Sequence, residues 1–228
     1  MQSPAPRLIN GPSDAAASVL LAHGAGAPMD SPFMDTIATG LAACGWRVVR
    51  FEFPYMARRR LSGRGAAPDR LPRLQEAFAE QVALEAQTGL PLVIGGKSLG
   101  GRVASTIADG QASQGVCGCL CLGYPFHPPG KPLQLRTEHL GQLRTPTLIV
   151  QGERDSFGRR DEVEGYDLSA AVALHWLTAG DHSFKPTRSS GCSEADQLAA
   201  AVAAADRFIR ACLPAPGPGA EVAAASSS

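Results

Sequence analysis

Strand-length apolar runs alternate with helix-length patterns from about residue 17 to residue 212. Several of these runs are apolar at every position, which is typical of parallel strands that helices cover on both faces. The alternation therefore predicts an α/β chain with a single doubly wound, mostly parallel sheet. The expected strands are residues 17–23, 46–53, 90–94, 115–124, 145–152 and 173–180.

The helices between these strands have recognisable ends. Ser31 is a suitable N-cap for a helix that ends before Gly45. Residues 71–89 carry apolar side chains at helical spacing and end in a glycine. Ser193 and Asp196 have the spacing of a capping box, with Asp in place of the usual Glu, at the start of an Ala-rich final helix.

Length and composition favour one domain with one core, because the chain has 228 residues and 44% apolar content. We expect an N-terminal extension at 1–16, an α/β domain at 17–212, and a disordered tail at 213–228 that is rich in Pro, Gly, Ala and Ser. The start has no basic segment followed by an apolar one, and no apolar run is long enough to cross a bilayer, so a cytoplasmic location is expected.

Charge gives no support for a polyanionic partner. Lys plus Arg and Asp plus Glu both number 21, so no overall field draws the protein toward nucleic acid or an anionic membrane.

Cys117, Cys119 and Cys121 alternate within one expected strand, and this spacing is too short for paired zinc ligands. We expect all three to lie on one face as small buried side chains, with no metal and no cofactor. The oligomeric state stays open.

The stretch GGKSLGG at residues 95–101 has two incompatible interpretations. The letters GKS end a phosphate-binding P-loop, whereas G-x-S-x-G forms the sharp turn that exposes a nucleophilic serine. A P-loop needs a further glycine at the position that Pro91 occupies, and residues 90–94 form the apolar strand itself. The nucleotide-binding interpretation therefore fails.

The nucleophile turn fits its surroundings. An apolar strand leads into Gly96, Ser98 and Gly100, and a helical pattern follows. Both glycines are needed because any side chain at these two positions would collide with the neighbouring chain. We therefore expect Ser98 to be a nucleophile at the apex of the turn.

A serine nucleophile requires an imidazole that accepts its proton and a carboxylate that orients the imidazole. In this kind of fold the chain order is serine, acid, histidine. His182, in a loop after the last strand, is preferred to His175, which lies in the middle of a strand. Asp155 follows the strand 145–152 and is the preferred acid. The other candidate acids are Glu153, Asp161 and Asp181.

An oxyanion hole requires two backbone N–H groups that point at the developing alkoxide. We assign one to Leu99, directly after the nucleophile, and the other to Ala25, with Gly26 as the alternative, in the loop HGAGAP. His23 at the start of that loop precedes the serine in the chain. We therefore expect it to shape the loop and not to act as the base.

The motifs HGAGAP, GGKSLGGR, QGERD and GDHSF together resemble the signatures of the α/β-hydrolase fold family over residues 17–212. The absence of a large insertion resembles the compact, cap-less branch near dienelactone hydrolase. GGKSLGGR and LGYPFHPPGKP are similar to a small bacterial group whose animal relatives include testis-expressed and chromatin-regulatory proteins. The resemblance implies a triad of Ser98, Asp155 and His182.

Several further side chains could surround the nucleophile. Lys97 could attract an anionic group, but we expect it to lie along the surface. The Pro-rich connection after residue 124 is too short for a lid and would overhang an open site. An arginine cluster at 58–73 fits either a substrate anion or, preferably, a solvated face. The candidate substrate-binding residues are Tyr55, Phe126, His127 and Phe184.

Two functions from different classes follow. The leading hypothesis is a serine hydrolase that cleaves a small carboxylic ester or thioester through an acyl-enzyme on Ser98. The alternative is a catalytically dispensable, hydrolase-like interaction protein. The partner in the first case is a small-molecule substrate, with no nucleic acid and no membrane.

Overall fold

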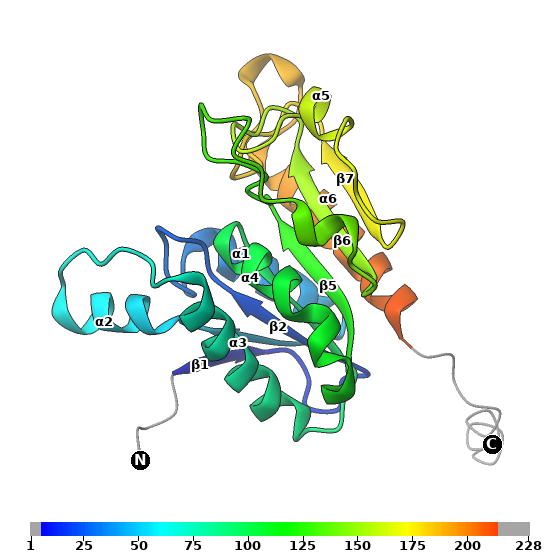
Figure 1. Cartoon of the computed structure of the whole chain (residues 1–228). Coiled ribbons are helices and arrows are strands. Elements are labelled where there is room, and N and C mark those ends of the chain that lie inside the picture. The colour runs from blue at the N-terminus through cyan, green and yellow to red at the C-terminus, as the bar shows by residue number, and fades with distance from the viewer. Residues whose placement is uncertain (1–5, 214–228) are drawn as a thin grey trace, which may run out of the picture.

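A seven-stranded sheet forms the centre of the computed structural model, which describes residues 6–213 (Figure 1). Its spatial order is β1-β3-β2-β4-β5-β6-β7, and every neighbouring pair except β1 with β3 is parallel. The strands are β1 (Arg7–Asn10), β2 (Ser18–Ala22), β3 (Arg47–Phe51), β4 (Leu92–Lys97), β5 (Val116–Leu122), β6 (Thr147–Gly152) and β7 (Val172–Leu177). The six expected strands and the mostly parallel α/β sheet are thus confirmed.

The edge strand β1 was not predicted. It pairs antiparallel with β3, with Arg7 opposite Phe51 and Asn10 opposite Val48. Residues 1–16 were expected to form an N-terminal extension, and residues 7–10 of this segment join the edge of the sheet. The four residues of β1 lack a continuous apolar run, and Ile9 is 51% exposed, because an edge strand buries little side-chain surface. The predicted tail at 213–228 lies outside the described residues apart from Leu213.

Helices cover both faces of the sheet. The three expected helices are present, and the helix after the nucleophile turn ends at Ile107 and continues as a 3₁₀ segment over Ala108–Gln114. The Ser193 cap is confirmed, since its Oγ accepts a hydrogen bond from the Asp196 amide. The helices are α1 (Pro32–Ala43), α2 (Pro54–Ser62), α3 (Leu71–Ala86), α4 (Leu99–Ile107), α5 (Arg160–Val163) and α6 (Glu194–Cys212), with short 3₁₀ turns at Glu138–Gly141 and Arg188–Ser190.

The sheet separates two apolar clusters. Helices α1 and α6 pack on one face against side chains such as Val19, Leu21 and Val150, whereas α3 and α4 pack on the other against Leu20 and Ile94 (Figure 1). Alternate residues of β2 thus enter opposite clusters, which explains why this strand is apolar throughout. No helix within residues 6–213 combines the length and hydropathy that a membrane span requires.

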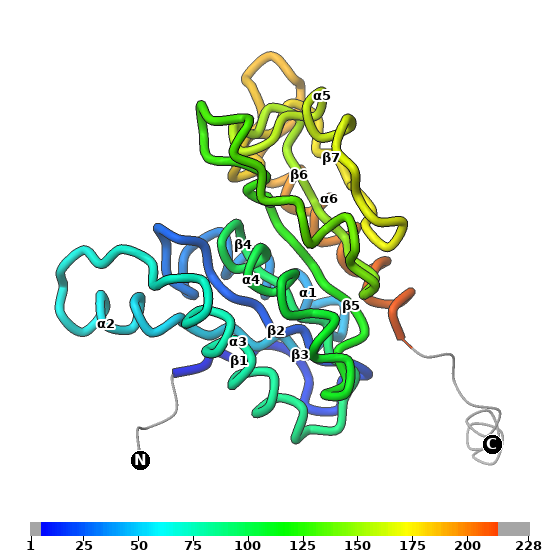
Figure 2. Tube along the Cα trace, in the orientation of Figure 1, coloured from blue at the N-terminus to red at the C-terminus, as the bar shows by residue number. Residues whose placement is uncertain are grey.

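The connection from β5 to β6 carries no cap domain. Figure 2 traces it as an irregular segment, in which the structure forms a single 3₁₀ turn at Glu138–Gly141. The carboxyl ends of β4, β6 and β7 lie at the same edge of the sheet because these strands are parallel. The loops that follow them are therefore neighbours in space.

One expectation about the cysteines was wrong. Cys119 and Cys121 enter the cluster under α3 and α4, but Cys117 packs in the cluster under α6. The cause is a register shift: Val116 pairs with Leu92, whereas Gly118 pairs with Val93, so Cys117 is an extra residue in a β-bulge. All three cysteines are free thiols.

Candidate active site

Ser98 lies at an abrupt turn between β4 and α4, in a backbone conformation that is rare for a side-chain-bearing residue (φ 51°, ψ −109°). The flanking glycines make the turn possible. A Cβ atom added to Gly96 would lie 2.1 Å from the carbonyl oxygen of Ala22, and one added to Gly100 would lie 2.3 Å from the same oxygen. The strand β2 thus approaches both positions so closely that only glycine fits.

His182 and Asp155 extend from Ser98 as a continuous chain of hydrogen bonds. Nε2 of His182 lies 2.9 Å from Ser98 Oγ, and Nδ1 lies 2.7 Å from Oδ2 of Asp155. Asp155 follows β6 and His182 follows β7, so three separate loops at one sheet edge supply the three groups. The structure therefore brings together the three side chains that the sequence selected.

Buried partners hold the Asp155 carboxylate. Gln151 donates from Nε2 to Oδ2 at 2.9 Å, and the Phe157 amide donates to Oδ1 at 2.8 Å. Asp155 is fully buried, so this carboxylate has no access to water that could replace these donors. Both oxygens are thus fixed, and Oδ2 is directed at the imidazole.

The other candidate acids have structural contacts instead. Glu153 accepts hydrogen bonds from the Ala179 amide and from Arg160, and Asp161 is exposed on α5. Asp181 accepts from the amides of Ser183 and Lys185 through Oδ1, and so closes the loop that carries His182. The preference for Asp155 agrees with this geometry.

A second serine–histidine contact, between Ser105 and His139, lacks the rest of this arrangement. Ser105 Oγ lies 2.9 Å from His139 Nε2 but also donates to the carbonyl of Arg102 within α4. Among residues 6–213, no carboxylate is hydrogen-bonded to the His139 ring. Burial lowers the pKa of His139 and the nearby Arg102 lowers it further, so this ring is a neutral packing group.

The residues expected to form an oxyanion hole flank the serine. Ala25 and Gly26 line the same cavity as Ser98, and Leu99 begins α4 directly after it. Within the described chain, the amides of Ala25 and Leu99 donate no intramolecular hydrogen bond, so both N–H groups are free to bind a substrate oxygen. Both ring nitrogens of buried His23 are engaged elsewhere, since Nε2 accepts from the Phe53 amide and Nδ1 contacts the Gly24 carbonyl. These contacts agree with a role in shaping the loop.

A cavity of about 370 Å³ opens beside Ser98. Its apolar wall includes Phe33 and Met34 from the start of α1 and Phe157 from the loop after Asp155. Phe157 also lies against the imidazole of His182, with ring centroids 4.2 Å apart. None of these three residues was expected at the site, because neither the first turn of a helix nor a loop aromatic carries a local signal that it faces a cavity. The remaining lining residues are Gly24, Ala25, Gly26, Ala27, Ser31, Pro32, Lys97, Ser98, His182 and Ser183.

None of the four expected substrate-binding residues lines this cavity. Tyr55 is buried, and its hydroxyl donates to the carbonyls of Gly24 and Ala25. It therefore holds the backbone of the loop that contains Ala25 and Gly26.

The other three are also packing residues. Phe126 is buried against Tyr124 and Tyr166, so the Pro-rich connection does not overhang the site with this side chain. His127 is buried and directed toward Glu162, and Phe184 lies beneath Phe33. Contacts with segments that are distant in the sequence therefore determine where these three side chains lie.

Lys97 does not lie along the surface, which corrects a further expectation. The residue is only 9% exposed, and its Nζ donates a hydrogen bond to the backbone carbonyl of His182. The structure also excludes the P-loop interpretation of GGKSLGG. Gly95, Gly96 and Lys97 belong to strand β4 and therefore form no loop around a phosphate.

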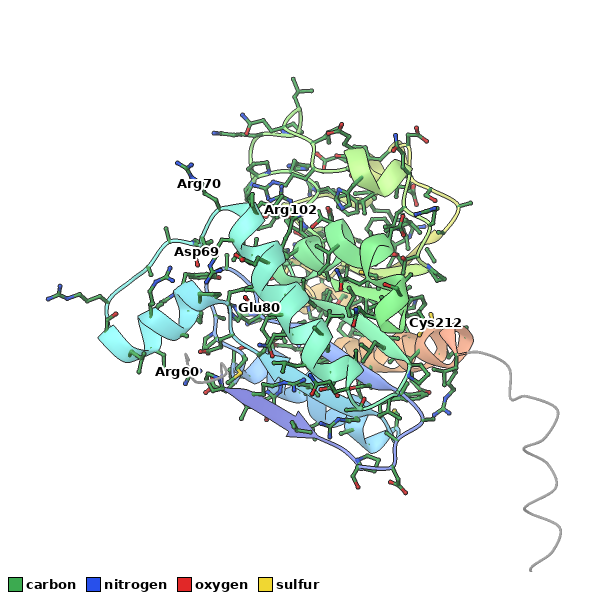
Figure 3. The ribbon with its side chains drawn as sticks, turned by 60° about the horizontal axis from the view of Figure 1, so that its bottom comes forward. Arg60, Asp69, Arg70, Glu80, Arg102 and Cys212 are labelled. Carbon is green, nitrogen blue, oxygen red and sulfur yellow. The ribbon has the colours of Figure 1, made fainter. Side chains whose placement is uncertain are left out.

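The arginine cluster is engaged in contacts on and around α2. Arg58 pairs with Asp69, Arg60 with both Glu52 and Asp30, and Arg73 with Glu76, and Figure 3 marks Arg60, Asp69 and Arg70 in this region. Arg70 is exposed. These contacts favour the solvated face over a substrate anion. Among residues 6–213, His, Cys, Asp and Glu side chains form no group of three or more that could hold a metal ion.

Comparison with known families agrees with this site. The model of the alpha/beta hydrolase domain family matches residues 15–210, which is most of the chain. The chain belongs to the α/β-hydrolase family. The matched range contains the nucleophile turn, the loop at 23–28 and both loops that carry Asp155 and His182.

Solved structures with the same fold include three compact hydrolases. A dienelactone hydrolase from Anabaena variabilis is similar with a TM-score of 0.67 at 21% identity, over 91% of this chain and 92% of that chain. An α/β serine hydrolase homologue from Coxiella burnetii gives 0.66 at 18% identity, over 88% and 89%. A serine hydrolase without a lid from Xanthomonas campestris gives 0.63 at 20% identity, over 92% and 90%. These likenesses support the cap-less fold.

Proposed function

We propose that this α/β-hydrolase is a serine hydrolase that cleaves a small carboxylic ester or thioester through an acyl-enzyme on Ser98. The observation that carries the proposal is the hydrogen-bonded chain from buried Asp155 through His182 to Ser98, at a turn whose strained backbone exposes the hydroxyl. The similarity to proteins described as serine hydrolases supports the same reaction class.

In the first half-reaction, Ser98 Oγ attacks the substrate carbonyl carbon while its proton moves to Nε2 of His182. Asp155 holds the Nδ1–H of the ring and stabilises the imidazolium that forms. His182 then gives this proton to the leaving alcohol or thiol, the bond from the carbonyl carbon breaks, and the acyl group stays on Ser98.

In the second half-reaction, water takes the place of the alcohol or thiol. His182 Nε2 accepts a proton from this water, the hydroxide attacks the acyl carbon, and the Ser98 oxygen leaves with the proton returned by His182. The products are a carboxylic acid and the free enzyme. No metal or cofactor is needed for either half-reaction.

Both tetrahedral intermediates carry an alkoxide, for which the amides of Leu99 and Ala25 are the proposed donors. The carbonyls of Gly24 and Ala25 accept from the Tyr55 hydroxyl, and the Gly24 carbonyl also contacts Nδ1 of His23. These contacts fix the peptide planes of the loop before substrate arrives, so the N–H groups need no reorganisation during the reaction. Gly26 is the alternative second donor.

The cavity supports a small substrate with an apolar portion. Phe33, Met34 and Phe157 form an apolar wall, and a volume of about 370 Å³ is at the small end of the range for ligand pockets. The small volume disfavours a long buried lipid chain, and the apolar wall disfavours a polyanion. Carboxylic ester and thioester both fit the chemistry of the triad.

The test is a series of p-nitrophenyl esters and acyl thioesters that vary in acyl length and charge. We expect turnover of short, uncharged acyl groups, with kcat/KM falling as the acyl chain outgrows the cavity. Activity that is independent of acyl length would contradict the cavity assignment. No turnover of any member, with an intact fold, would favour the alternative of an interaction protein in which the triad is dispensable.

A further inference from the structure

Lys97 contacts the main chain of the proposed catalytic histidine. Within residues 6–213, the backbone of His182 takes part in a single hydrogen bond, and its donor is the Nζ of Lys97. We propose that Lys97 is a positioning residue, whose ammonium group holds the His182 loop so that the imidazole faces Ser98. This inference rests on the proposed function.

The ammonium group of Lys97 is surrounded by the His182 carbonyl and two aromatic rings. Nζ lies 5.2 Å from the ring centroid of Phe33 and 5.5 Å from that of Phe184, and both distances are typical of cation–π contacts. One carbonyl and two aromatic rings thus replace most of the water around the charge. No other hydrogen-bond acceptor within the described residues reaches Nζ.

The opposite side of the contact is shaped by Gly123, at the end of β5. Its backbone has φ +67°, and an added Cβ would lie 2.6 Å from Lys97 Nζ and 2.9 Å from the carbonyl oxygen of His182. A side chain here would therefore enter the space between donor and acceptor. Three elements, β4, β5 and the loop after β7, meet at this point.

A contribution to stability alone does not explain why the buried side chain at position 97 carries a charge. Burial lowers the pKa of Lys97 to about 8, even though the carboxylates of Asp155 and Asp181 act in the opposite direction. The folded protein thus loses stability by keeping an ammonium group here at neutral pH, and an apolar side chain would avoid this cost. A stability loss at a site of this kind is typical of a functional constraint.

The hydrogen bond from Lys97 affects the orientation of the His182 imidazole. His182 lies in the loop that follows β7, which ends at Leu177. The first part of this loop is bonded to other elements, since the Ala179 amide donates to Glu153 and the Gly180 carbonyl accepts from the Arg154 amide. Next to His182, Asp181 closes the turn onto itself by accepting from the amides of Ser183 and Lys185. Lys97 directly precedes Ser98 in the chain, so its bond ties this loop to the strand that positions the nucleophile. A displacement of the ring by about 1 Å would cost about 10²-fold in rate.

The experiment compares the full-length wild type with Lys97→Met, which keeps the length of the side chain and removes the ammonium group. The matched control is Lys185→Met, which removes an exposed cation from the same loop. We measure kcat and KM with p-nitrophenyl acetate from pH 6 to pH 10, and hydrogen exchange of the segment 178–186.

For Lys97→Met we expect kcat to fall about 10- to 100-fold with KM nearly unchanged, and exchange in 178–186 to become faster. Wild type should lose activity as pH rises through about 8, when the ammonium group titrates beside Asp155 and Asp181, and this inflection should be missing in Lys97→Met. Lys185→Met should match the wild type in all three readouts.

A Lys97→Met protein with wild-type kcat, pH profile and loop exchange would overturn the inference and leave the proposed function intact. A wild type without serine-dependent hydrolysis would overturn the proposed function first, and the positioning role with it. If Lys97→Met does not fold, Lys97→Gln replaces it. Its shorter, neutral amide should also lack the pH 8 inflection, and a retained inflection would overturn the inference.

Discussion

The imidazole Nε2 of His182 lies 2.9 Å from the hydroxyl of Ser98, although 84 positions separate these residues in the chain. The parallel sheet produces this contact, because β4 and β7 end at the same edge and each is followed by a loop that turns over that edge. The proposed chemistry depends on this contact and on the residues that hold its two partners in place.

The first prediction concerns the carboxylate that orients the imidazole. In Asp155→Asn, the neutral amide can no longer stabilise the imidazolium. Its single oxygen can accept from only one of the two donors, because Gln151 donates to Oδ2 and the Phe157 amide donates to Oδ1 in the wild type. We expect kcat to fall about 10³- to 10⁴-fold, with little change in KM. Steady-state kinetics checks this, with Asp161→Asn on exposed α5 as the control. A loss below tenfold would show that Asp155 is not the orienting acid.

The second prediction concerns the loop that supplies the proposed oxyanion donor. Tyr55→Phe removes the hydroxyl that bonds to the carbonyls of Gly24 and Ala25. Since one hydrogen bond contributes about 1 kcal/mol, we expect kcat to fall about 3- to 10-fold while KM stays nearly constant. Tyr166→Phe, at a half-buried position remote from the loop, is the control. A change confined to KM would indicate that Tyr55 acts on substrate binding instead.

The third prediction concerns the space at the nucleophile turn. Gly100→Ala places a methyl group 2.3 Å from the carbonyl oxygen of Ala22, so β2 or α4 must shift. We expect the free energy of unfolding to drop by about 2–4 kcal/mol, measured by denaturant titration. Gly110→Ala is the matched control, because nothing lies within 4 Å of its added Cβ. Equal stability of the two variants would contradict the close packing of β2 against the turn.

The fourth prediction uses the ionisation of Lys97. Its pKa is about 8 in the folded protein against an ordinary value of 10.5, so between these two pH values the unfolded chain binds more protons than the folded one. The free energy of unfolding of the wild type should therefore rise with pH in this window, and the penalty is fully present below pH 8. Relative to Lys97→Met, the wild type should gain about 2 kcal/mol between pH 8 and pH 10. Parallel curves for the two proteins would show that the ammonium group is not buried.

Local sequence signals predicted the sheet, and they selected three side chains that the structure brings together. The turn at Ser98 has glycines on both sides, and the position of Asp155 and His182 after successive strands places them at the edge where Ser98 lies. Each of these signals involves only a strand, its end and the residues that follow, so chain order was sufficient to select them.

Features that depend on contacts distant in sequence were missed. The burial of Lys97 requires Phe33, Phe184 and Gly123, which come from three other parts of the chain. Phe126 and Tyr55 were expected at the substrate because they follow strands, but aromatic side chains at such positions also serve as packing groups. The edge strand β1 has too few buried positions to show an alternating pattern.

The central claim is that Ser98 is a nucleophile activated by His182, and covalent labelling with a fluorophosphonate probe tests it most directly. We predict stoichiometric labelling of the wild type, with the modified peptide containing Ser98, and no labelling of a folded Ser98→Ala variant. Equal labelling of both proteins, or no labelling of a folded wild type, would contradict the claim.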